Sequence, residues 1–142
     1  MACSDWAWWG VQAAPLAWML VGLLGLLRPL SMRFVAHGLF PIGALVGVVL
    51  AVCAAQALGP GSCATVLPLG LPDLPMHLRL DALSAFFLLL LGSVSAAVLL
   101  FSAGYFRAGE GTAPGLLARQ YHTFLAAMAW VLLADDAYAF MV

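Results

Sequence analysis

The sequence predicts an all-α polytopic membrane protein with four transmembrane helices, the start of a fifth, and a proline-rich loop. Hydrophobic residues make up 65% of the 142 residues and charged residues only 8%, whereas a soluble domain carries about a quarter charged residues. No Lys or Arg occurs between Arg33 and Arg79. Four apolar stretches approach or exceed the roughly 20 residues that a helix needs to cross a bilayer.

The composition also excludes several classes of function. The net charge of −1 is far from the strongly basic balance of nucleic-acid-binding proteins. Cys3, Cys53 and Cys63 have no metal-ligand spacing, and we interpret them as inert thiols. We therefore expect no metal or cofactor in this chain and no nucleic acid as a partner.

The first predicted helix covers residues 6–27, where Gln12 is the one polar residue. Its beginning carries an aromatic belt typical of membrane interfaces, formed by Trp6, Trp8 and Trp9. No basic residue precedes it, which argues against a cleaved secretory signal, so we expect this segment to remain in the membrane. Pro29 should end the helix before a short basic turn.

The second predicted helix covers residues 34–58. Its small residues at intervals of four favour close helix–helix packing: Gly43, Gly47 and Ala51. Residues 59–80 then hold four prolines, which exclude a helix. Leucines and other residues alternate on both sides of residues 72–73, so a β-hairpin is one interpretation and an irregular loop is the other.

Asp81 precedes the third predicted helix, residues 82–106, and is a suitable N-cap because its carboxylate accepts from free N–H groups of the first turn. A fourth helix is predicted over residues 117–134, and Asp135 and Asp136 break its apolar run. The apolar residues that follow predict a fifth helix beginning at about residue 137, in a sequence truncated there. Residues 1–142 would then form one N-terminal transmembrane bundle.

The arginines predict an orientation in the membrane. Four of them flank the loops after the first and third predicted helices: Arg28, Arg33, Arg107 and Arg119. The other side holds only Arg79. Because basic loops stay in the cytoplasm, we expect a multi-pass protein of the inner (plasma) membrane with its N-terminus outside.

Few residues are candidates for chemistry, and no catalytic group is predicted. His37 and His122 lie near the predicted cytoplasmic helix ends. They mark either a point where protons enter or interfacial histidines at headgroup depth, and we favour the second interpretation. Asp135 and Asp136 either guide protons at the outer mouth or form a polar helix stop, in which Asp136 caps the next helix; we favour the helix stop.

Three segments resemble the antiporter-like, proton-conducting membrane subunits of complex I and its relatives. Residues 78–87, which contain Asp81-Ala-Leu-Ser84, are similar to the start of that family's third helix. Residues 104–111 are similar to the following loop, and residues 124–142 to the fourth helix and the start of the fifth. The Asp-Asp-Ala-Tyr-Ala-Phe run is most similar to the branch of hydrogenase-4 and formate hydrogenlyase membrane component B.

The resemblance implies the N-terminal part of a proton-translocating subunit of a redox-driven complex, with protons or sodium ions as substrates. Its partners would be the lipid bilayer, other membrane subunits and peripheral redox subunits. The family's ion-moving glutamate in the fifth helix would fall beyond Val142. The alternatives are a subunit of complex I, a subunit of a multisubunit cation/proton antiporter, and a small structural membrane protein that assists assembly.

Overall fold

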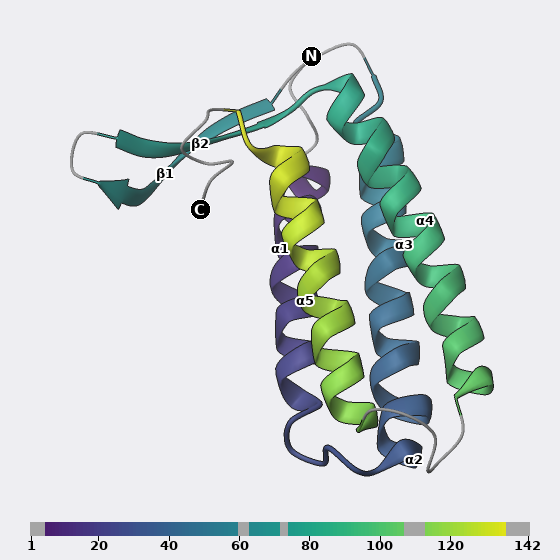
Figure 1. Ribbon diagram of the computed structural model, residues 1–142. Coiled ribbons are helices and arrows are strands. Elements are labelled where there is room, and N and C mark those ends of the chain that lie inside the picture. Colours follow the sequence, from purple (N-terminus) through teal and green to yellow (C-terminus); the bar gives the residue numbers. More distant parts are fainter. Residues whose placement is uncertain (1–4, 60–62, 72–73, 107–112, 136–142) are drawn as a thin grey trace.

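Four long helices lie side by side in the computed structural model, and a two-stranded sheet projects at one end of them (Figure 1). The structure describes residues 5–59, 63–71, 74–106 and 113–135. In chain order the elements are α1 (Asp5–Leu24), α2 (Met32–Phe34), the π-helix η1 (Val35–Leu39), α3 (Phe40–Gln56), β1 (Cys63–Leu71), β2 (Leu74–Leu80), α4 (Ala82–Tyr105) and α5 (Pro114–Leu133).

Three helical segments are long and apolar enough to cross a bilayer: Trp6–Leu24, Met32–Gln56 and Ala82–Tyr105. The fourth predicted transmembrane helix exists as α5, which has 20 residues but is not among these three candidates. Polar residues explain the difference, because the first half of α5 carries Arg119, Gln120 and His122. The predicted fifth helix lies outside the described residues.

The first helix ends earlier than predicted, at Leu24 instead of residue 27. The next three N–H groups bond carbonyls three residues back, as in Gly25 N to Gly22 O at 3.1 Å, so the chain tightens before it turns. Pro15 lies inside α1 without ending it. Membrane helices tolerate such prolines when neighbouring groups satisfy the freed carbonyl.

The second span begins at Met32, two residues before the predicted start. The Ser31 hydroxyl accepts a hydrogen bond from the Phe34 N–H at 3.4 Å and caps the first turn. The π-helix η1 then widens the chain immediately before Pro41. A proline ring meets the carbonyl four residues earlier in a regular α-helix, so the wider turn provides room for Pro41.

The last helix begins at Pro114, three residues before the predicted start. Proline suits the first helical position because its missing N–H would have no intrahelical partner there. Gly115 follows it, and its N–H donates to the Pro29 carbonyl at 2.9 Å. This bond ties the start of α5 to the turn after α1.

Strands β1 and β2 pair antiparallel, with Cys63 opposite Leu80 and Leu71 opposite Leu74. The register shifts between Leu67 and Gly70. The connecting residues 72–73 lie outside the described residues. Leu78 and Leu80 are buried, so the inner end of β2 joins the core of the bundle.

Small residues bring the helices together in two close pairs, α3 with α4 and α1 with α5 (Figure 1). A Cβ added at Gly92 would lie 2.6 Å from the Gly47 carbonyl oxygen and 2.8 Å from the Ala51 nitrogen. The face of the second span that was predicted to pack against another helix therefore packs against α4. In the other pair, a Cβ added at Gly25 would lie 2.7 Å from the Gly115 carbonyl oxygen.

Candidate functional site

His122 lies in the interior of the bundle, on the third turn of α5, and its exposed fraction is 0%. The ring of Phe40 stacks on it with 6.5 Å between ring centroids. A Cβ added at Gly22 of α1 would lie 3.3 Å from the His122 Cβ, so α1 approaches it closely. His122 is therefore enclosed by other helices, and the choice between a point where protons enter and a histidine at headgroup depth stays a prediction.

The two ring nitrogens of His122 have different surroundings. Nδ1 lies 2.7 Å from the Ala118 carbonyl oxygen, which only accepts, so Nδ1 carries the hydrogen in the neutral ring. Nε2 is buried and has no hydrogen-bond partner within the described part of the chain. It is directed at Gly43 of α3, where any Cβ would collide with it.

Gly43 connects this histidine with α1 as well. The Trp18 indole Nε1–H donates to the Gly43 carbonyl oxygen at 3.0 Å, and Trp18 is fully buried. Three helices therefore meet around Gly43: Trp18 from α1, Gly43 from α3 and His122 from α5. The sequence indicated Gly43 as a helix-packing residue, but it did not indicate that Trp18 and His122 lie beside it.

His37 differs from His122, although the sequence suggested the same roles for both. Its side chain is exposed, on the π-helix η1. The structure thus separates one buried histidine from one exposed histidine.

Asp81 occupies the cap position predicted for it. Its carboxylate Oδ1 accepts a hydrogen bond from the Ser84 backbone N–H at 2.8 Å, at the first turn of α4. This bond lowers the pKa of the Asp81 carboxyl below its ordinary value, and the nearby Arg79 adds to the effect.

Asp135 follows the end of α5 and contacts strand β2. Its carboxylate lies 3.6 Å from the Arg79 guanidinium, and its N–H donates to the His77 carbonyl at 3.2 Å. Asp136 lies outside the described residues. Asp135 is thus held beside β2, beyond the last turn of α5, whereas His122 lies in the first half of that helix. No group of three His, Cys, Asp or Glu side chains within the described ranges is arranged to hold a metal.

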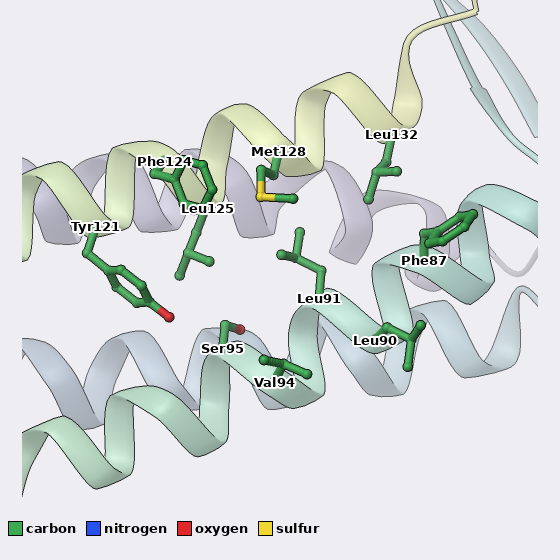
Figure 2. Close-up of a pocket in the computed structure, with 10 residues that line it drawn as sticks. All are labelled: Phe87, Leu90, Leu91, Val94, Ser95, Tyr121, Phe124, Leu125, Met128 and Leu132. Carbon is green, nitrogen blue, oxygen red and sulfur yellow. The ribbon is translucent and has the colours of Figure 1, made fainter.

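A groove of about 370 Å³ runs between α4 and α5. Figure 2 shows the Tyr121 hydroxyl directed across the groove toward the helix that carries Ser95. Ser95 donates to the Gly92 carbonyl at 3.0 Å, within its own helix. The remaining lining is apolar and offers no chemistry: Phe87, Leu90, Leu91, Val94, Phe124, Leu125, Met128 and Leu132.

Gln12 is a second buried polar side chain in the bundle. Its exposed fraction is 8%, and its amide nitrogen has no hydrogen-bond partner among the described residues. It is the one polar residue of the first apolar stretch. Polar residues in membrane helices are rare and usually face the protein interior. The sequence alone could therefore have indicated that Gln12 is buried.

Comparison with known protein families finds a match for the middle of the chain. Residues 67–113 match the family model described as NADH-ubiquinone oxidoreductase (complex I), chain 5 N-terminus. The match covers about a third of the chain, from β1 through β2 and α4 to the start of α5. It supports an antiporter-like, proton-translocating membrane subunit. Comparisons with curated proteins and with solved structures give no match.

Proposed function

We propose that this chain is the N-terminal part of a proton-translocating membrane subunit in a redox-driven complex of the hydrogenase-4 and formate hydrogenlyase type. The observation that carries the proposal is the match of residues 67–113 to the N-terminus of chain 5 of complex I. The Asp-Asp-Ala-Tyr-Ala-Phe run at residues 135–140 favours the hydrogenase branch. Protons or sodium ions are the transported substrates.

The placement of charges in the bundle supports a defined orientation of this subunit in the membrane. Figure 1 shows the turn after α1 and the start of α5 at one end and the β1–β2 sheet at the other. Arg28 and Arg33 belong to the first end together with Arg119 near the start of α5, whereas Asp81 and the Arg79–Asp135 pair belong to the second. Basic ends remain in the cytoplasm, so β1–β2 and the beginning of α1 face outward.

In this proposal α5 is the fourth crossing. Its one buried ionisable side chain, His122, is enclosed by protein instead of lipid. Polar side chains in membrane helices almost always face the bundle interior in this way. The described helices then form a scaffold, beside which later segments of a longer protein carry the transported ion.

Affinity purification from native membranes tests the proposal. The tagged full-length protein is extracted in mild detergent, and its partners are identified by mass spectrometry. We expect subunits of a nickel–iron hydrogenase together with iron–sulfur proteins. Recovery of NADH dehydrogenase subunits or of cation/proton antiporter subunits would instead assign the chain to one of those complexes. Recovery without any redox or transport subunit would contradict the proposed function and favour a structural assembly protein.

A further inference from the structure

His122 is a wholly buried ionisable side chain to which the proposed scaffold gives no role. Its Nδ1–H is fixed by the Ala118 carbonyl at 2.7 Å. The other nitrogen, Nε2, is an acceptor without a donor among the residues that the structure describes. Buried polar atoms are normally hydrogen-bonded, and each exception calls for a physical explanation.

Gly43 supplies the contact that Nε2 makes. Because a Cβ at Gly43 would collide with Nε2, the hydrogen that glycine carries in that direction points at the nitrogen. A C–H group is a weak donor, so it suits an unprotonated Nε2. The neutral ring therefore fits its site closely, with no space for a further atom between Nε2 and Gly43.

We infer that His122 is a buried proton-binding site whose occupation separates α5 from α3. A proton delivered by solvent hydronium forms an N–H bond at Nε2, releases a water molecule and leaves the ring with a charge of +1. The new N–H would face the hydrogen of Gly43, a donor against a donor, and finds no acceptor there. The ring can keep its Ala118 bond only if the Gly43 backbone moves away.

Within the described residues, the helical turns around His122 offer no carboxylate to hold the charged ring in its present place. Residues 6–24 of α1, α3 and α4 carry no Asp, Glu, Lys or Arg. Besides His122, the ionisable residues on α5 and on the described elements around it are Asp5 at the first position of α1, Cys53, Tyr105, Tyr121, His37, His77, Arg79 and Arg119. Of these, Tyr121 has its ring 6.2 Å from the His122 ring, between centroids.

This inference deepens the proposed function, and its meaning for proton transport rests on that function. The experiment that tests it requires neither a partner subunit nor a transport measurement. Spin labels are placed on outward positions of the full chain in lipid nanodiscs, at Leu45 of α3 and Phe124 of α5, which are 63% and 57% exposed. The native cysteines are replaced by alanine. Distances between the labels are measured at about pH 8 and about pH 4, on either side of the range in which histidines titrate.

We expect the distance to lengthen at the lower pH by on the order of 1–2 Å, the size of known helix shifts. His122→Phe should abolish the change, whereas the matched control His37→Asn, at an exposed histidine, should keep it. Gly43→Ala should lengthen the distance at both pH values. ¹⁵N NMR of labelled histidine should show the Nδ1–H form of His122 at the higher pH.

Two results would overturn the inference. One is an unchanged distance in the unmodified protein, whether or not the ring is protonated. The other is an equal change in His122→Phe, which would place the pH response elsewhere. These two distance comparisons still test the inference if Gly43→Ala does not fold. They also do not depend on whether redox partners are purified with the protein.

Discussion

Asp81 determines where α4 begins, because its carboxylate satisfies the Ser84 N–H. Replacing an N-cap Asp by Ala typically costs about 1 kcal/mol. We therefore predict that Asp81→Ala lowers the free energy of unfolding by about that amount, measured by denaturant titration in detergent micelles. The matched control Asp81→Ser keeps a capping oxygen and should retain most of the stability. Equal losses in both variants would show that the cap is unimportant.

The same residue gives a pH dependence with a definite sign. Because the pKa of Asp81 is lowered in the folded protein, its contribution to stability is fully present above the unfolded value of about 3.9. It is lost as the pH falls through the folded pKa. We predict that the stability difference between the unmodified protein and Asp81→Ser shrinks or reverses below about pH 4, as followed by thermal unfolding. A difference that is constant with pH would contradict this role.

Sequence reasoning located Asp81 correctly but did not predict that other helices enclose His122. An N-cap is a local feature, because the capping atom and its N–H partner lie three residues apart. The surroundings of His122 are not local, since they come from Trp18, Phe40 and Gly43 on other helices. Position along a helix indicates depth in the membrane but not which face meets a neighbour.

At the level of the elements, the α3–α4 contact depends on glycine at two facing positions, Gly47 and Gly92. A larger side chain at Gly92 would meet backbone atoms, which cannot move aside cheaply. Overpacking of this kind costs about 1–3 kcal/mol, and we predict at least that loss for Gly92→Val in denaturant titrations. Gly104 of α4 has open space around it, so Gly104→Val should cost much less. Similar losses at both positions would mean that the close contact is not formed.

The ion pair between Arg79 and Asp135 links β2 to the end of α5 but is half exposed, with side-chain fractions of 49% and 37%. Exposed pairs contribute about 0–1 kcal/mol. We expect Arg79→Gln to change the unfolding free energy by less than about 1 kcal/mol, measured in the same titrations. A much larger loss would show that this pair, and not the buried Leu78 and Leu80, attaches the sheet.

The four long helices and the start of α4 followed from the sequence, whereas the β1–β2 pairing was left open and the other helix ends differ from the prediction. Apolar runs of membrane length specify helices because every backbone group in lipid must be bonded internally. The ends depend on contacts between elements, such as the bond from Gly115 N–H to the Pro29 carbonyl. Helix-start rules could also have predicted Pro114 at the first position of α5.

For the whole molecule, the central claim is that the helices cross a membrane with the basic ends of the bundle in the cytoplasm. Three helices have the length and composition to cross, and we propose α5 as the fourth. An even number of crossings places residues before α1 and after α5 on the same side. The β1–β2 sheet lies on that side too, between the second and third crossings.

Paired reporter fusions test this claim most directly. Alkaline phosphatase is fused after Gly59, which precedes β1, and separately after Ala113, which precedes α5, and its activity is measured in intact bacterial cells. The account predicts an active enzyme after Gly59 and an inactive enzyme after Ala113, with green fluorescent protein giving the opposite pattern. An inactive phosphatase after Gly59, or recovery of the unfused chain in the detergent-free soluble fraction, would contradict it.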